Sequence, residues 1–90
     1  MFSFDKHVKI RQEKNGAVVF DTLREKVFIT DEIGAHILRL MKEGLSAEEM
    51  AAVLAERYEQ APEVIQRHLT EFIQQLEESA LVTAEEESRG

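Results

Sequence analysis

The chain has 90 residues, no cysteine and a formal net charge of −7. This length fits one domain with one small core, and a hydrophobic content of 43% is enough to build it. The lack of cysteine excludes a disulfide scaffold, a thiolate metal site and a cysteine nucleophile. The first five residues are too short and polar for a signal peptide, and no apolar run is long enough for a membrane span. We therefore expect a cytoplasmic protein without a membrane partner.

The charge is divided unevenly along the chain. Residues 1–45 contain eight Lys and Arg against seven Asp and Glu, whereas residues 46–90 contain three against eleven. The first half thus has a net charge of +1 and the second half −8. An acidic field repels a phosphate backbone instead of gaining from counterion release, so the charge argues against a nucleic-acid partner. Much of it also serves simply to keep a small protein in solution.

Three short segments near the start have the pattern of β-strands. Residues 8–11 alternate apolar and basic side chains, residues 17–21 are β-branched and aromatic, and residues 26–29 are again mostly apolar. Turns are expected at Lys14-Asn15-Gly16 and at residues 22–25. The pattern predicts an antiparallel three-stranded meander, which is marginal alone and requires helices packed on one face.

The third strand segment runs directly into a helix, because the hydrophobic period changes there from two to nearly four. We expect Val27, Phe28 and Ile29 both to complete the core and to leave one backbone edge free. Thr30 or Asp31 is placed to cap this helix, and Gly44 is the expected left-handed stop. Gly34 either admits a close neighbour or costs about 1 kcal/mol relative to alanine. The predicted buried stripe consists of Ile33, Ile37, Leu40 and Met41.

Two more helices are predicted in the second half. Ser46 and Glu49 form a capping box at the start of one, whose predicted buried residues are Met50, Val53, Leu54 and Tyr58. Pro62 suits the first position of the other, which extends to about Ser79 and is apolar at Ile65, Leu69, Phe72, Ile73 and Leu76. Residues 80–82 add a short extended piece. We expect residues 1–83 to form the domain and residues 84–90 to be a disordered acidic tail. The predicted fold is α+β and winged-helix-turn-helix-like, with a three-stranded antiparallel sheet followed by three helices.

No group of residues indicates catalysis or metal binding. His7, His36 and His68 are far apart in the chain, and none has a metal-ligand spacing such as HExxH. The serines have terminal, capping or tail positions, and the four glycines form no phosphate-binding loop. Neighbouring carboxylates are explained by capping and by a solvated surface. We expect a protein that is not an enzyme, with no catalytic residue, no metal and no cofactor.

Two binding surfaces are consistent with the predicted fold. The first is the open edge of the third strand, which only Arg24 and Lys26 protect and which could add a strand from a partner. The second is the outer face of the third helix, for which an ordinary solvated face is the competing interpretation. Its residues are Glu63, Arg67, Thr70, Glu71, Gln74 and Gln75.

An ordered set of residues resembles the PqqD family over about residues 8–83. The set begins with Val27 to Ile37 at the junction of strand and helix. It continues through Leu40, Gly44, Ser46-Ala47-Glu48-Glu49, Leu54 and Tyr58, and ends with Phe72-Ile73, Leu76 and Leu81-Val82. The chain departs from the family pattern at His68, where an acidic residue is frequent, and at Ala80, where glycine is usual.

The resemblance implies a RiPP recognition element, a non-catalytic peptide chaperone for ribosomally made precursor peptides. Such a domain binds the leader segment as an extra strand and presents it to a modifying enzyme, often a radical-SAM enzyme. The implied peptide-binding residues are Lys26, Val27, Phe28 and Ile29 in the strand, and Val64, Arg67, His68 and Glu71 in the third helix. A monomer or a weak homodimer is expected.

Two other functions remain open on sequence grounds. One is a winged-helix DNA-binding regulator. Its recognition helix should be basic, but the third helix has one basic residue, Arg67, and four acidic ones, Glu63, Glu71, Glu77 and Glu78. The other is an adaptor or homodimer that pairs strand to strand through the same edge.

Overall fold

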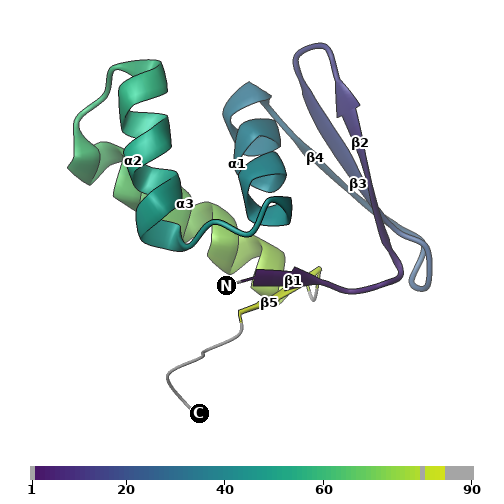
Figure 1. The fold of residues 1–90 in the computed structure, drawn as a ribbon. Helices are drawn as coiled ribbons and strands as arrows, with labels where there is room; N and C mark the ends of the chain where they lie inside the picture. Colours follow the sequence, from purple (N-terminus) through teal and green to yellow (C-terminus); the bar gives the residue numbers. More distant parts are fainter. Residues whose placement is uncertain (1, 80, 85–90) are drawn as a thin grey trace.

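The computed structural model describes residues 2–79 and 81–84 (Figure 1). Within them, three strands followed by three helices form the predicted α+β fold, and one short strand is added at each end. The strands are β1 (Phe2–Phe4), β2 (Val8–Glu13), β3 (Gly16–Asp21), β4 (Lys26–Thr30) and β5 (Val82–Ala84). The helices are α1 (Glu32–Lys42), α2 (Ala47–Tyr58) and α3 (Pro62–Glu78).

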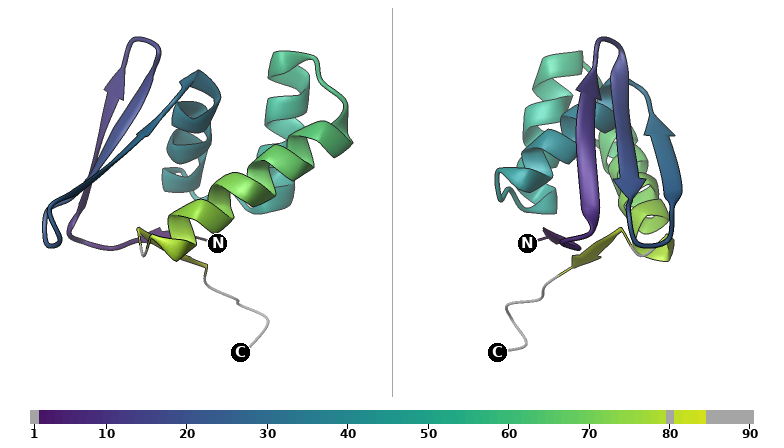
Figure 2. Two further views of the ribbon diagram at one scale, coloured as in Figure 1. Left: turned by 180° about the vertical axis from the view of Figure 1, so that it is seen from behind. Right: turned by 90° about the vertical axis from the view of Figure 1, so that its right-hand side faces the viewer.

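Strands β2, β3 and β4 form an antiparallel sheet in that order. All three helices lie on one side of this sheet, as the two turned views show (Figures 1 and 2). The core fills the space between the sheet and the helices. Its most buried members include Val19 from the sheet, Leu38 from α1, Met50 from α2 and Leu76 from α3, all with no exposed surface. Apolar burial from one face of the sheet and one stripe of each helix therefore holds the domain together.

A second, two-stranded sheet joins the two ends of the described chain. Strand β1 pairs antiparallel with β5, and Phe4 lies opposite Val82. Strand β5 ends at Ala84, one residue beyond the domain boundary expected after residue 83. Strand β1 was not predicted, since a three-residue strand has too few positions to show a period of two. The rest of the expected acidic tail, residues 85–90, lies outside the described residues.

The predicted helix ends are confirmed. The Asp31 side chain accepts a hydrogen bond from the Gly34 N–H at 2.9 Å and caps α1. Ser46 and Glu49 form the capping box of α2, with N···O distances of 2.8 and 3.2 Å. Gly44 follows α1 with φ of 93°, a conformation that glycine adopts without strain.

Two predictions of burial are wrong. Val53 is 37% exposed, because α2 directs Met50, Ala51 and Leu54 into the core instead. Val27 and Ile29 do not complete the core either, since they are 57% and 74% exposed. The reason is the period of a strand: successive side chains of β4 point to opposite faces, and only Phe28 of these three points toward the helices.

Candidate functional site

Strand β4 is an edge of the three-stranded sheet, so one side of its backbone pairs with no other described strand. Which of its residues face that open side follows from the hydrogen bonds of the neighbouring strands. The Thr22 N–H donates to the His7 carbonyl at 3.0 Å, which makes these two residues a hydrogen-bonded pair. In an antiparallel ladder, hydrogen-bonded and non-bonded pairs alternate. Counting from this pair along the β2–β3 register, every second pair is hydrogen-bonded, and these pairs include Phe20 and Val18. Phe20 and Val18 therefore direct their backbone N–H and C=O groups to β2.

The same alternation assigns the other residues of β3 to β4. Val19 and its alternate neighbours point their N–H and C=O groups to β4, where Val19 lies opposite Phe28. Phe28 thus uses its backbone within the sheet. Val27 and Ile29, its two neighbours, direct their N–H and C=O groups to the open edge. Unpaired groups of this kind form a template for an added strand.

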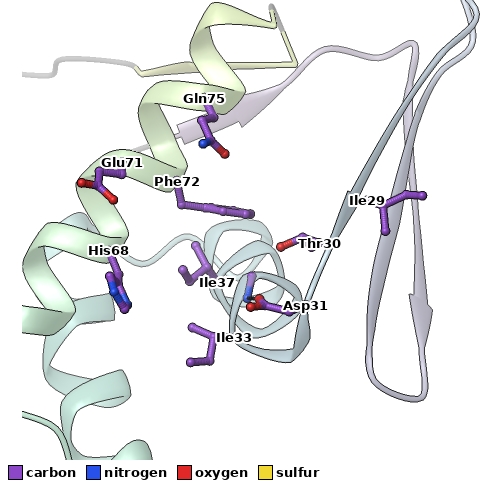
Figure 3. A pocket seen from close by; sticks show the side chains of 10 residues that line it. Ile29, Thr30, Asp31, Ile33, Ile37, His68, Glu71, Phe72 and Gln75 are labelled. Atoms are coloured by element: carbon purple, nitrogen blue, oxygen red, sulfur yellow. Dashed lines mark hydrogen bonds between the residues drawn. The ribbon is translucent and has the colours of Figure 1, made fainter.

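A groove of about 640 Å³ lies at the C-terminal end of this edge, between β4, α1 and α3. Helix α3 contributes His68, Glu71, Phe72 and Gln75, which have the spacing i, i+3, i+4 and i+7 of one helix face. The opposite wall and floor come from the end of β4 and the first turns of α1, with Thr30, Asp31, Ile33, Gly34 and Ile37. Figure 3 shows Phe72 and Ile37 directed into this space, while the Ile29 side chain points away from it. Ile29 thus borders the groove with its backbone.

Gly34 lets three elements meet at the groove floor. A Cβ atom at this position would overlap the Thr30 hydroxyl and lie 2.9 Å from Cε1 of Phe72. Phe72 also packs edge to face against Phe28, with ring centroids 5.9 Å apart. Close packing of α1 with a strand and another helix therefore explains the glycine. Of the two interpretations that the sequence allowed, Gly34 admits a close neighbour.

The structure brings half of the eight predicted peptide-binding residues to the groove and leaves the other half outside it. Ile29, His68 and Glu71 line the groove. Phe28 lies beneath it through its contact with Phe72. The other four, Lys26, Val27, Val64 and Arg67, are not among the described residues that line it. Gln75 also lines the groove. The family resemblance did not include it, although the sequence placed it on the candidate surface of the third helix. Its spacing of seven positions from His68 places both on one face of that helix.

A second, smaller pocket of about 150 Å³ lies on the other side of α1 and is mainly polar. Its lining includes His36, Arg39, Arg57 and Tyr58. Nδ1 of His36 lies 3.3 Å from the Tyr58 hydroxyl. Burial lowers the pKa of His36 below its usual value of 6.5, and the charges of Arg39 and Arg57 lower it further. Both effects favour the neutral form of this histidine.

Two further findings bear on the class of protein. Among the described residues, no three His, Asp or Glu side chains are placed to hold a metal ion. No described helix is long and apolar enough to cross a membrane.

Comparison with known proteins identifies the family. The model of the family described as coenzyme PQQ synthesis protein D (PqqD) matches residues 16–82, which include the groove and its open strand edge. The chain belongs to the PqqD family. A comparison of this chain with curated proteins finds no significant match.

Two solved structures share the PqqD-like fold of this chain. One is TbiB1 in complex with the TbiA(beta) leader peptide, with a TM-score of 0.85 and 20% identity, covering 93% of this chain and 98% of TbiB1. The other is a lasso peptide synthetase B1 complexed with the leader peptide, with a TM-score of 0.84 and 19% identity, covering 92% of this chain and 98% of that one. The likeness extends over nearly the whole of each chain.

Proposed function

We propose that this PqqD-family protein binds the leader segment of a ribosomally made precursor peptide and presents it to a separate modifying enzyme. The leader would pair with the open edge of β4 and place alternate side chains in the groove against α3. The observation that carries this proposal is the orientation of Val27 and Ile29, whose backbone N–H and C=O groups face the open edge of β4. Both solved structures of similar fold contain a leader peptide, which supports the same role.

The groove fits this mode of binding physically. Main-chain pairing makes little demand on leader sequence, whereas the side chains that enter the groove provide selectivity. The floor of Ile33, Ile37 and Phe72 is apolar, and His68 and Glu71 give it a polar border. A disordered leader must lose conformational entropy when it binds, so we expect micromolar affinity, about −8 kcal/mol. Tethering then raises the concentration of the core peptide at the enzyme.

The proposal gives this protein no catalytic step of its own. The modifying enzyme carries out the chemistry, and a radical-SAM enzyme is the partner that we expect. We expect the leader, this protein and the enzyme to form their complex in the cytoplasm. We expect the free protein to be a monomer or a weak homodimer, because a dimer that pairs through β4 would compete with the leader for the same edge.

A pair of proline variants tests the proposal. Ile29→Pro removes an N–H group that faces the open edge, so the sheet should remain folded. Phe28→Pro removes an N–H group that bonds to β3, so it should disrupt the sheet. The labelled leader of the precursor encoded beside this gene is titrated, and fluorescence anisotropy is measured. We expect Ile29→Pro to weaken leader binding at least about tenfold while circular dichroism stays native.

The matched control is Ile29→Thr, which keeps the N–H group and the β-branched shape but alters the exposed side chain. It should bind the leader nearly as well as the wild type. Undiminished binding to a folded Ile29→Pro variant would rule out strand addition at this edge.

The DNA-binding alternative has no support from these observations. Helix α3 has one described cation, Arg67, against Glu63, Glu71, Glu77 and Glu78, and the comparisons show leader-peptide complexes instead. Salt-dependent binding to duplex DNA in an anisotropy titration at low ionic strength would reverse this order.

A further inference from the structure

The face of the sheet opposite the helices, here called the outer face, has a continuous apolar patch. Val18 of β3 lies beside Ile29 of β4, and Phe20 lies beside Val27, so the four side chains form one block. Ile29 and Val27 are 74% and 57% exposed, and Val18 and Phe20 are half-buried. Single exposed apolar side chains are ordinary, but a contiguous group of them marks an interaction surface.

Basic residues extend this patch along β2. Lys9 lies opposite Phe20 and Arg11 opposite Val18, on the same outer face. The Arg11 guanidinium lies over the Phe20 ring, 5.5 Å from its centroid. It is only partly neutralised, by an exposed ion pair with Glu13. The outer face is therefore apolar over β3 and β4 and basic along β2.

The charge of the whole domain follows the same division. Residues 6–30, which include the sheet, contain six Lys and Arg and three Asp and Glu, a net charge of +3. Residues 31–78, which include the helices, contain four and eleven, a net charge of −7. The outer face thus attracts an acidic surface, and the helical side repels one.

We propose that the outer face docks an acidic and partly apolar surface of the peptide-modifying enzyme; this inference rests on the function proposed above. A second copy of the chain fits this face less well. A two-fold dimer through the outer face would bring Lys9 and Arg11 toward their own copies, which is unfavourable. Contact of the outer face with the acidic helices of another copy would be head-to-tail and would not close into a dimer.

The bound leader would enlarge the same surface. The leader side chains that do not enter the groove would project from the outer face beside Val27 and Ile29, because strand side chains alternate. The enzyme would then contact this protein and the bound leader together. The enzyme should therefore bind this protein more tightly when the leader is bound than when it is absent. By linkage, the enzyme should increase the affinity for the leader by the same factor.

The test uses variants on β2 and β3, away from the edge that binds the leader. Lys9→Glu combined with Arg11→Glu reverses the charge of the outer face, and Phe20→Thr removes its central aromatic side chain while keeping a residue that favours strands. Lys42→Glu on α1 and Val53→Thr on α2 are the matched controls, because they make similar changes elsewhere on the surface. The probe is the purified modifying enzyme encoded beside the precursor gene, titrated by calorimetry with and without saturating leader.

We expect the charge-reversal variant and Phe20→Thr each to weaken enzyme binding at least about tenfold. Leader binding should stay within about twofold of the wild type, and the controls should behave as the wild type does. Unchanged enzyme binding in both outer-face variants, with leader binding intact, would overturn this inference and leave the proposed function standing. Failure of the wild-type protein to bind the leader would instead contradict the proposed function.

Two other results would also overturn the inference. Light scattering that shows a dimer of the wild type but a monomer of Phe20→Thr would assign the outer face to a second copy. Binding of a single-stranded oligonucleotide that is lost in the charge-reversal variant would assign it to nucleic acid.

Discussion

Phe28 and Phe72 meet edge to face, with ring planes at 67° and centroids 5.9 Å apart. This contact joins the edge strand β4 to α3, the two elements on either side of the groove. Edge-to-face pairs of this kind contribute about 0.5–1.5 kcal/mol beyond the area that they bury. The pair therefore connects the stability of the fold to the width of the candidate site.

The first prediction concerns this aromatic pair. Phe28→Leu and Phe72→Leu in a double-mutant cycle should give a coupling energy of about 0.5–1.5 kcal/mol in urea unfolding. Phe72→Ala alone should lower the free energy of unfolding by about 1–3 kcal/mol, less than for a fully buried phenylalanine, because Phe72 is only half-buried. It should also weaken leader binding, since it removes part of the groove floor. Additive effects of the two leucine variants would show that the rings do not interact.

The second prediction concerns Gly34. Alanine at an ordinary helix position gains about 1 kcal/mol over glycine. At Gly34 the added methyl group would overlap the Thr30 hydroxyl and crowd Phe72, and strain of this kind costs about 1–3 kcal/mol. Gly34→Ala should therefore lower the unfolding midpoint despite its better helix propensity. Thr30→Ala should relieve the loss only in part, because the Thr30 Cβ would still be 2.8 Å away. A gain in stability from Gly34→Ala would contradict the close packing at this point.

The third prediction is a pH dependence caused by His36. Burial holds the pKa of His36 below its usual value of 6.5, and Arg39 and Arg57 act in the same direction, against a smaller opposite effect of Glu43 and Glu32. Below pH 6.5 the unfolded chain then binds a proton at this residue more readily than the folded chain. The contribution to stability is full above pH 6.5 and is lost as the pH falls through the lower, folded pKa.

Thermal unfolding measured between about pH 7.5 and pH 5 checks this effect. His36→Gln should make stability less dependent on pH over that range. His68→Gln is the matched control, because it removes an exposed histidine. An equal change in slope for both variants would show that His36 is not the origin.

The fourth prediction concerns Asp21, the buried carboxylate that shapes the connection between β3 and β4. Its Oδ1 atom accepts hydrogen bonds from the N–H groups of Leu23 and Arg24, each at 3.0 Å. Its Oδ2 atom accepts from Nη1 of Arg24 at 3.2 Å. The bond from the Arg24 backbone lowers the pKa of Asp21 most, while burial acts in the opposite direction.

The Asp21 contribution to stability is present above its usual pKa of 3.8 and is lost as the pH falls through the lower, folded value. Asp21→Ala should lower the unfolding temperature at pH 7 and shift β4, so leader binding should weaken as well. Asp5→Ala is the control, because Asp5 makes a similar bond to the His7 N–H at an exposed turn. A larger loss from Asp5→Ala would contradict the importance of the β3–β4 connection.

Local sequence signals determined most of the secondary structure. The capping box of Ser46 and Glu49, the stop at Gly44 and Pro62 at the start of α3 depend on neighbouring residues, and all are confirmed. The junction between β4 and α1 was equally clear, because two different hydrophobic periods meet there. The ordered set of residues around this junction was also sufficient to indicate the PqqD family.

Contacts between distant segments could not be predicted in this way. Strand β1 exists because it pairs with β5 at the other end of the described chain, and neither segment is long enough to reveal a period. The groove likewise requires Gly34, Thr30 and Phe72 to meet from three elements.

A strand followed directly by a helix at Lys26 to Thr30 could be predicted from local sequence, because alternation and capping depend on neighbouring residues. The role of each residue in that strand depends instead on how the whole domain packs. Phe28 directs its side chain to the core and its backbone to β3, whereas Val27 and Ile29 direct their side chains to solvent and their backbone to the open edge of the sheet. The direction of each hydrogen bond depends on the register of three paired strands, and a single strand contains no information about that register.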